Sequence, residues 1–229
     1  MSSSSIAARL RENLARIRDR IDAACRRSGR DPSDVTLVAV TKSAGDAEVG
    51  ALLDLGVRDF GESRAAEGSA RAARFGGDAR WHFIGHLQTN KSAKVVAAFH
   101  VLHSLDRRPL AEELEKRCAA HNKQLAAFLQ VNVSGENTKG GFHPDEVKRE
   151  RFLLHLDFPR VRIKGMMTMA PAGPPESARP VFRRLRELAE ECMLSNLSMG
   201  MSDDFEVAIE EGATHIRVGS ALFASSNKV

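Results

Sequence analysis

The sequence of 229 residues is short of cysteine and of long apolar runs. Its three cysteines are odd in number and far apart, and no C-x-x-C pair occurs, which argues against a disulfide framework and favours a reducing compartment. No run of 18 apolar residues appears, and the amino-terminal stretch MSSSSIAARLREN has no apolar core of the secretory kind. We therefore expect a cytoplasmic protein that makes no membrane contact.

The patterns of histidine and arginine argue against a metal-binding protein and against a nucleic-acid-binding protein. There is no H-E-x-x-H motif, and His82 and His86 fall on a strand and its following loop, so they do not share one helical face and we expect no metal site. The net charge of +4 permits anionic ligands. No aromatic residue interleaves the arginines of the first segment, so we expect no nucleic-acid partner.

Beyond residue 30 the chain alternates between strand-like and helical patterns. Apolar runs predict strands at 35–41, 57–61, 80–84, 100–104, 125–133, 161–166, 194–198 and 213–218. Helical periodicity predicts helices at 46–55, 63–75, 90–98, 108–121, 144–156, 177–193 and 203–211. Residues 1–30 add an amino-terminal helix whose apolar side should pack on the body. Eight strands alternating with helices favour a single α/β domain over residues 1–229, a closed (β/α)8 TIM barrel; an open doubly wound sheet is the alternative.

In either fold a ligand binds at the carboxyl ends of the strands. The stretch LVAVTK (37–42) ends a buried strand on a lysine, and lysine is rarely buried without a partner. Lys42 is therefore either solvated after the strand has ended, or a nucleophilic amine within a pocket. An amine beside a phosphate site can form a Schiff base with the aldehyde of pyridoxal 5′-phosphate.

Two later loops have the composition of phosphate-binding segments. Gly200, Met201 and Ser202 precede a predicted helix, and Gly219 and Ser220 follow the last predicted strand. Backbone N–H groups and hydroxyls at such positions bind phosphate, and in barrels the usual site follows strands seven and eight. Asp203 and Glu206 form a D-x-x-E pattern that predicts a capping box and competes with an anion for the same helix end.

Several stretches together resemble the pyridoxal phosphate homeostasis protein family, namely LVAVTK, FGES, WHFIGHLQTNKSAKV, VNVSGENTKGGF, GMMTM and LSMGMSDDFEVAIEEGATHIRVGSALF. The resemblance extends from about residue 35 to 223. It implies a barrel of the alanine racemase N-terminal-domain type and a role in supplying or buffering the cofactor, with no established reaction. The family pattern usually has Asn at the place of Ser63 and Thr at the place of Ser220, so this chain departs from it twice.

The resemblance also implies a set of cofactor contacts. Lys42 would carry pyridoxal phosphate as a Schiff base, Arg217 would face the pyridine nitrogen, and the phosphate would lie against Ser202, Gly219 and Ser220 with neighbouring backbone. Weaker candidates for cofactor contact are Ser63, His82 and Lys139, of which His82 is also expected as a hydrogen-bonded residue beneath the pocket. We expect a monomer that passes the cofactor to apo forms of pyridoxal phosphate-dependent enzymes.

Two rival functions follow from the same residues. The first is a racemase-like enzyme using pyridoxal phosphate, but the racemase relatives use a tyrosine from an additional domain, and this chain contains no tyrosine. An arginine at the pyridine nitrogen also weakens the ring as an electron sink. The second is a P-loop-like nucleotide site at Gly85–Ser92, where Asn90 replaces the second glycine; Thr89 or Asn90 as a helix N-cap is the simpler interpretation. We therefore expect a cofactor carrier without efficient catalysis.

Overall fold

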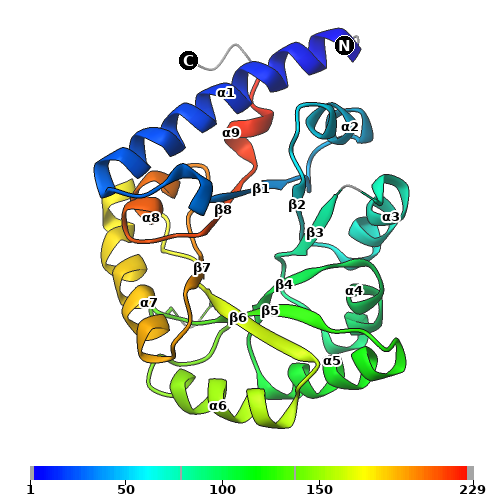
Figure 1. Cartoon of the computed structure of the whole chain (residues 1–229), viewed down its shortest axis with the longest axis vertical. Helices are drawn as coiled ribbons and strands as arrows, with labels where there is room; N and C mark the ends of the chain where they lie inside the picture. The colour runs from blue at the N-terminus through cyan, green and yellow to red at the C-terminus, as the bar shows by residue number, and fades with distance from the viewer. Residues whose placement is uncertain (1–2, 78, 137, 226–229) are drawn as a thin grey trace.

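The computed structural model describes residues 3–77, 79–136 and 138–225. Eight parallel strands follow one another around a closed barrel in chain order, and pairing of the first with the eighth completes it (Figure 1). The strands are β1 Thr36–Val40, β2 Asp59–Glu62, β3 Arg80–Phe83, β4 Val101–Leu105, β5 Leu125–Gln130, β6 Val161–Met167, β7 Asn196–Ser198 and β8 His215–Val218. The predicted (β/α)8 barrel is confirmed, and the open sheet is excluded because the sheet closes on itself.

Helices form the outer layer around this barrel (Figure 1). They are α1 Ser3–Ser28, α2 Asp46–Asp54, α3 Ala65–Phe75, α4 Ser92–Ala98, α5 Arg108–Ala120, α6 Val147–Asp157, α7 Arg179–Glu191, α8 Phe205–Glu210 and α9 Ser220–Phe223. Short 3-10 turns occupy Pro32–Asp34, Thr89–Lys91 and Pro175–Ala178. In the described ranges, no helix has both the length and the apolar character that crossing a membrane requires.

The amino-terminal helix α1 is tied to the end of the chain. Leu10, Leu14, Ile17 and Ile21 are all buried, as the spacing predicts, and α1 packs on α2, α8 and α9. Asn13 donates to the carbonyl oxygens of Leu222 and Ala224, each at 3.0 Å. The helix therefore holds α9, and with it the segment that follows β8.

Two different cores result from the alternation of side chains along each strand. Between the sheet and the helices the packing is apolar, with pairs such as Phe60 on Trp81 and Phe83 on Phe99. The barrel interior instead carries polar groups from β3, β4, β7 and β8: His82, His103, Ser198 and Arg217 are buried, and His215 is half-buried. A barrel is normally filled by branched apolar residues, so this polar interior is a specific feature of the chain.

The main differences from the predicted elements lie at their ends. β5 stops at Gln130 because Val131 forms only an isolated bridge to Phe142. α6 begins at Val147 and not at Pro144, so the proline does not open that helix. Gly56 and Gly212, which follow α2 and α8, adopt φ of +85° and +100°, the left-handed conformation that glycine commonly takes after a helix.

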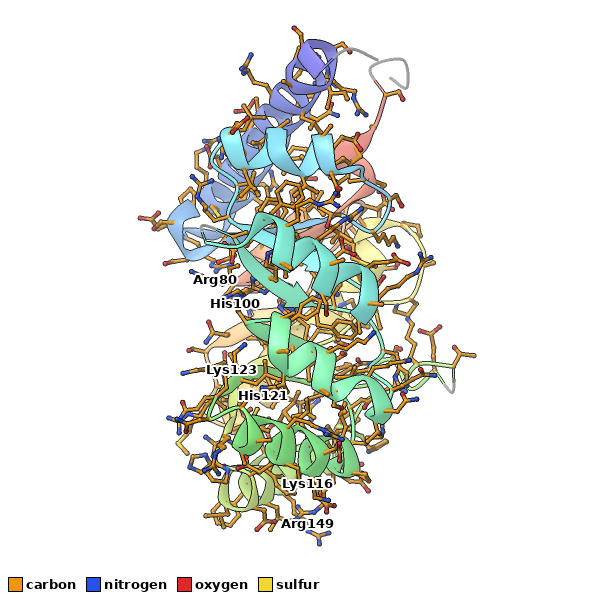
Figure 2. All side chains as sticks on the ribbon, turned by 90° about the vertical axis from the view of Figure 1, so that its right-hand side faces the viewer. Arg80, His100, Lys116, His121, Lys123 and Arg149 are labelled. Carbon is orange, nitrogen blue, oxygen red and sulfur yellow. The ribbon has the colours of Figure 1, made fainter. Side chains whose placement is uncertain are left out.

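Figure 2 shows the side of the barrel on which Arg80, His100 and Lys123 lie one after another along the amino-terminal ends of β3, β4 and β5. Arg80 Nη1 lies 3.4 Å from Asp59 Oδ1, and His100 Nδ1 accepts from the backbone N–H of Trp81 at 3.0 Å. Lys123 Nζ donates to the Val96 carbonyl oxygen at 2.8 Å, at the end of α4. These three side chains are thus largely engaged with the body of the protein.

Candidate functional site

A cavity of about 410 Å³ opens at the carboxyl ends of the strands. Its walls come from β1, β8 and the loops that follow β1, β2, β3, β6 and β7. The lining residues are Val40, Lys42, Ser43, Ser63, Ile84, Met169, Met201, Ser202, Asp203, Arg217, Gly219, Ser220 and Phe223. The size is that of a small-molecule site, and the lining combines an apolar floor with a few polar groups, as such sites usually do.

Lys42 reaches this cavity from the turn after β1, but the residue as a whole is exposed. The two expectations for Lys42 are therefore both partly met: the strand has ended, and the side chain still lines the cavity. The side chain of Lys42 is thus not enclosed by the protein. What the structure provides instead is a turn whose backbone is held in place.

The turn around Lys42 is held by Arg71, a residue of α3. Arg71 Nη1 donates to the Thr41 carbonyl oxygen at 2.5 Å, and Nη2 donates to the Ala44 carbonyl oxygen, so one guanidinium spans the lysine. The same Nη1 lies 2.5 Å from the carboxylate of Glu62, which is 1% exposed. Glu62 also accepts the hydroxyl of Thr41 at 2.5 Å.

Arg217 lines the same cavity from β8, the strand that pairs with β1, and is buried. Its Nη1 donates to Ser198 Oγ at 2.6 Å and its Nη2 to the Thr168 carbonyl oxygen at 3.0 Å. Burial lowers the pKa of Arg217 to about 10, against which the nearby Asp204 carboxylate acts. The guanidinium thus remains charged at neutral pH.

The loops after β7 and β8 meet at Ser202. Ser202 Oγ accepts from the backbone N–H groups of Gly219 and Ala221 at 3.3 and 3.2 Å. Both distances are at or beyond the long end of the usual range for such bonds. At Gly219 a Cβ atom would come within 3.2 Å of Val40 Cβ, so the glycine lets the loop approach β1 closely.

The predicted cofactor contacts divide into two groups. Seven line the cavity: Lys42, Ser63, Met201, Ser202, Arg217, Gly219 and Ser220. The structure does not bring Gly200, His82 or Lys139 to that lining. Gly200 lies one residue away, with φ of +90° and its carbonyl oxygen accepting from Arg217 N at 3.0 Å.

His82 and Lys139 have other partners. His82 is fully buried and bonded to Asp59 and His103, which agrees with its interpretation as a hydrogen-bonded residue beneath the pocket. Lys139 forms an ion pair with Glu136, and its Nζ donates to the Met169 carbonyl oxygen at 3.4 Å. Because Met169 lines the cavity, Lys139 lies beside the rim.

Two helix-cap predictions near the site are wrong. α8 begins at Phe205, so Asp203 and Glu206 form no capping box; Glu206 pairs with Arg20 of α1 at 3.0 Å, and Asp204 Oδ1 accepts from Met201 N at 2.6 Å. Burial raises the pKa of Asp204, which the Met201 N–H and the charge of Arg217 oppose. Thr89 is not an N-cap either, since Lys91 precedes α4 and Thr89 Oγ1 accepts from Arg107 at 3.1 Å.

Sequence reasoning missed the residues that support the site, above all Arg71, Glu62, Ser198 and His103. The alternation of strand residues was a usable signal for two of them, because His103 and Ser198 sit at inward positions of β4 and β7. Nothing local marks Arg71, whose partners lie 9 to 30 residues away. Among the described residues, no group of three or more His, Cys, Asp and Glu residues is arranged to hold a metal ion.

Fold and site together define a (β/α)8-barrel protein with a small-molecule cavity lined by a lysine and a buried arginine. The family described as "Alanine racemase, N-terminal domain" matches residues 10–227. The pyridoxal phosphate homeostasis protein of Aquifex aeolicus is 42% identical over 220 residues, which cover 93% of this chain and 96% of the relative. The chain belongs to the pyridoxal phosphate homeostasis protein family, as its motifs indicate.

Two of the solved structures that resemble this one show how far the likeness extends. PipY of Synechococcus elongatus PCC7942 with PLP bound is 34% identical, with a TM-score of 0.80 and coverage of 94% of this chain and 100% of that one. Alanine racemase of Clostridium difficile 630 is 16% identical, with a TM-score of 0.76, and 96% of this chain covers 58% of that one. The racemase likeness concerns the fold alone, and the racemase chain has a further portion that this chain does not match.

Proposed function

We propose that this protein binds pyridoxal 5′-phosphate in the cavity and serves in homeostasis of the cofactor, holding it covalently on Lys42 and delivering it to apo forms of enzymes that need it. The observation that carries the proposal is the composition of one cavity: an amine, a buried guanidinium and a hydroxyl-lined loop pair. The names of the relatives, and the PLP bound in the structure of PipY, support it.

The residues present fit the chemical groups of this cofactor. When bound, pyridoxal phosphate supplies an aldehyde, a pyridine nitrogen and a phosphate dianion. Lys42 offers the amine for the aldehyde, and Arg217 offers N–H donors for the ring nitrogen. Ser202 and Ser220 offer hydroxyls for the phosphate. The backbone N–H groups of Gly219 and Ala221, held loosely by Ser202, can take an anion as a second partner.

Each of these residues has a defined part in binding. Arg217 keeps its proton at neutral pH, so a ring nitrogen facing it accepts a hydrogen bond and stays unprotonated. This arrangement disfavours carbanion chemistry and favours storage over turnover. Arg71 holds the backbone on both sides of Lys42 and so restricts the positions that Lys42 Nζ can reach. Because Lys42 is exposed, a covalent link between its amine and the cofactor would be accessible to an incoming amine.

Lys139 is the candidate for a second contact during delivery. Its bond to the carbonyl oxygen of Met169, a lining residue, puts a cation beside the cavity. We expect Lys139→Ala to change the rate at which the cofactor reaches an acceptor apoenzyme. An unchanged transfer rate would leave Lys139 as an ordinary loop residue paired with Glu136.

The proposal is tested by borohydride reduction of the protein loaded with pyridoxal phosphate. The absorption band of the bound cofactor should disappear, and peptide mass mapping should find the reduced adduct on the peptide that contains Lys42. Lys42→Ala should fold and give no adduct at that position, whereas Lys139→Ala, which alters a lysine outside the cavity lining, should still give it. An adduct solely on another lysine would overturn the assignment of Lys42.

The cavity gives no separate support to the two alternative functions, a racemase and a nucleotide-binding protein. The likeness to alanine racemase concerns the fold, so a racemase function has no observation of its own in this cavity. Gly85 of the P-loop-like stretch has a packing reason, because a Cβ atom there would lie 2.3 Å from the Ser63 carbonyl oxygen. A cytoplasmic monomer without efficient catalysis remains our proposal for the state in which the protein works.

A further inference from the structure

A single chain of hydrogen bonds runs through the barrel interior from Asp59 to Arg217. Asp59 Oδ1 lies 2.8 Å from His82 Nε2, and His82 Nδ1 lies 2.9 Å from His103 Nε2. His103 Nδ1 lies 2.7 Å from Ser198 Oγ, which Arg217 Nη1 contacts at 2.6 Å. Five strands, β2, β3, β4, β7 and β8, therefore contribute one residue each to a continuous connection.

The two ends of this chain face opposite mouths of the barrel. Asp59 is the first residue of β2, its side chain is 16% exposed, and it lines a separate cavity of about 410 Å³ beneath α1. Arg217 lines the cavity at the carboxyl ends of the strands. The residues between them, His82, His103 and Ser198, are fully buried. Packing a row of polar groups along a barrel axis is costly unless every group is satisfied.

The chemistry of the end groups restricts the direction of the bonds. A guanidinium can only donate, so Ser198 Oγ accepts from Arg217. Burial raises the pKa of Asp59, but the hydrogen bond from His82, with the charge of Arg80, outweighs this and leaves the pKa below its ordinary value. Asp59 is thus a carboxylate that only accepts, and His82 Nε2 donates to it.

Two arrangements of the middle protons then remain. Burial holds the pKa of His103 well below its ordinary range, helped by His82 and Arg217, so His103 is neutral and carries one N–H. If that proton is on Nδ1, Ser198 Oγ accepts twice, and its own hydroxyl proton has no acceptor among the described residues. If it is on Nε2, Ser198 donates to His103 Nδ1, and His103 donates to His82 Nδ1. Only the second arrangement satisfies every proton.

We propose that Asp59, His82, His103 and Ser198 act as positioning residues that orient the Arg217 guanidinium towards the ring nitrogen of the bound cofactor. In this arrangement every donor points towards Asp59, so the carboxylate at one mouth polarises the Ser198 hydroxyl and strengthens it as the acceptor of Arg217. The inference rests on the proposed function for the identity of the ligand, but the direction of the chain is a property of the protein without ligand.

The direction can be tested first on the protein free of cofactor. Two-bond ¹⁵N–¹H NMR correlations of labelled imidazoles distinguish the two neutral tautomers, and His82→Gln and His103→Gln spectra assign the two rings among the eight histidines. We expect both His82 and His103 to carry their proton on Nε2 at neutral pH. A proton on His103 Nδ1 would reverse the direction of the hydrogen bonds between His103 and its neighbours, and would overturn the proposal whatever the protein binds.

The second test measures affinity for pyridoxal phosphate and the position of its absorption band. Ser198→Ala removes the acceptor of a charged donor and should weaken binding about tenfold. Asp59→Asn keeps an oxygen that can accept from His82 but removes the negative charge. Because three side chains separate this position from Arg217, we expect affinity for pyridoxal phosphate to fall only roughly threefold, with a shift of the cofactor's absorption band. Ser92→Ala, which removes a buried hydroxyl without a hydrogen-bond partner, is the matched control and should change neither.

The outcomes separate the two proposals. If the parent protein forms no borohydride-stable adduct, the proposed function fails, and the tautomers alone decide the direction of the chain. If the adduct forms but Asp59→Asn binds with parental affinity and an unshifted band, the chain has no role in positioning beyond local packing. Should Ser198→Ala fail to fold, Asp59→Asn still decides, because its side chain lies partly exposed at the opposite mouth.

Discussion

The guanidinium of Arg71 and the carboxylate of Glu62 form an ion pair at 2.5 Å directly behind the turn that carries Lys42. The side chain of Glu62 is 1% exposed and that of Arg71 18%; Oε1 of Glu62 takes both Arg71 and Thr41, and Oε2 has no hydrogen-bond partner in the described structure. The same guanidinium bonds to the carbonyl oxygens of Thr41 and Ala44. The pair therefore joins the stability of the β1–β2 corner to the position of Lys42.

Replacing Arg71 should destabilise the protein strongly. Arg71→Met leaves a buried carboxylate without its counter-charge, and removal of one partner of a buried pair costs about 3–5 kcal/mol of unfolding free energy. Urea unfolding of the cofactor-free protein measures this. Arg74→Met is the control on the same helix: its pair with Asp46 is 64% and 39% exposed, so the change should cost less than about 1 kcal/mol. Equal losses in the two variants would contradict the role of burial.

The double variant Glu62→Gln, Arg71→Met separates stability from positioning. Without the carboxylate, no buried charge is left unpaired, so most of the unfolding free energy should return. The carbonyl oxygens of Thr41 and Ala44 still lack their donor, and Lys42 should react with pyridoxal phosphate more slowly than in the parent protein. A double variant that recovers both stability and reaction rate would show that the clamp does not position Lys42.

A negative charge at Ser220 should weaken binding through the phosphate. Ser220 is exposed at the cavity lining, so Ser220→Glu fits sterically but sets a carboxylate against a dianion. Ser220→Gln is the control of equal size without charge. We expect the glutamate variant to lose at least about tenfold in affinity for pyridoxal phosphate and little for pyridoxal, by spectrophotometric titration. An equal loss for both ligands would assign Ser220 to the ring or to the fold.

The half-buried His215 should make the protein less stable in mild acid. Burial lowers the pKa of His215 to about 4, with a smaller effect of His82. Between pH 6.5 and 4 the unfolded chain binds a proton that the folded protein does not, so stability falls as the pH falls through this range. The shift corresponds to about 3 kcal/mol at the lower end of the range.

The measurement is the unfolding free energy of the cofactor-free protein at several pH values. His215→Gln should flatten the dependence between pH 6.5 and 4, whereas His121→Gln, at an exposed position that Figure 2 shows on the outer surface, should leave the slope unchanged. His103 contributes in the same direction, so some slope should remain. A parental slope in His215→Gln would mean that His215 is protonated in the folded protein.

The sequence was sufficient for the barrel because its signals are local. Alternation of apolar runs with helical periodicity predicts every strand and its order, and chain order equals spatial order in this fold. The same rule predicts that Lys42, Ser202 and Ser220 share one mouth, as the cavity lining shows. Only the ends of elements were misplaced, as at Gln130 and Val147, where bridges and loop contacts decide the boundary.

The support beneath the site could not be predicted in the same way. The clamp at Arg71 and the chain from Asp59 to Arg217 depend on which side chains meet across strands, with separations up to 95 residues. Histidine in a strand has no preferred partner in sequence, and inward orientation alone does not say which neighbour it bonds. A buried polar contact of this kind is set by three-dimensional distance, which a single sequence does not contain.

Efficient racemisation needs an acid–base group on each face of the substrate carbon. Lys42 can serve one face of this cavity. Apart from Lys42 and Arg217, the only lining residue with an ionisable side chain is Asp203, which is exposed beside Ser202 and the proposed phosphate contacts. Neither Cys192, which is buried at the end of α7, nor His82, which bonds to Asp59 and His103, is among the residues that line the cavity.

We therefore expect the protein loaded with pyridoxal phosphate to exchange the α-proton of alanine only slowly. Loss of one acid–base group typically costs about 10²- to 10⁴-fold in rate, and an arginine at the ring nitrogen lowers the rate further. Incubation with L-alanine in deuterated water, followed by NMR, measures D-alanine and α-deuterium together. Lys42→Ala is the background control, and Asp203→Asn shows whether that carboxylate supplies the second group.

Turnover near the median enzyme rate of about 10 per second would replace the carrier with a racemase. Slow exchange together with transfer of the cofactor to an apoenzyme would support the carrier, because the cavity would then bind its ligand without the groups needed to transform it.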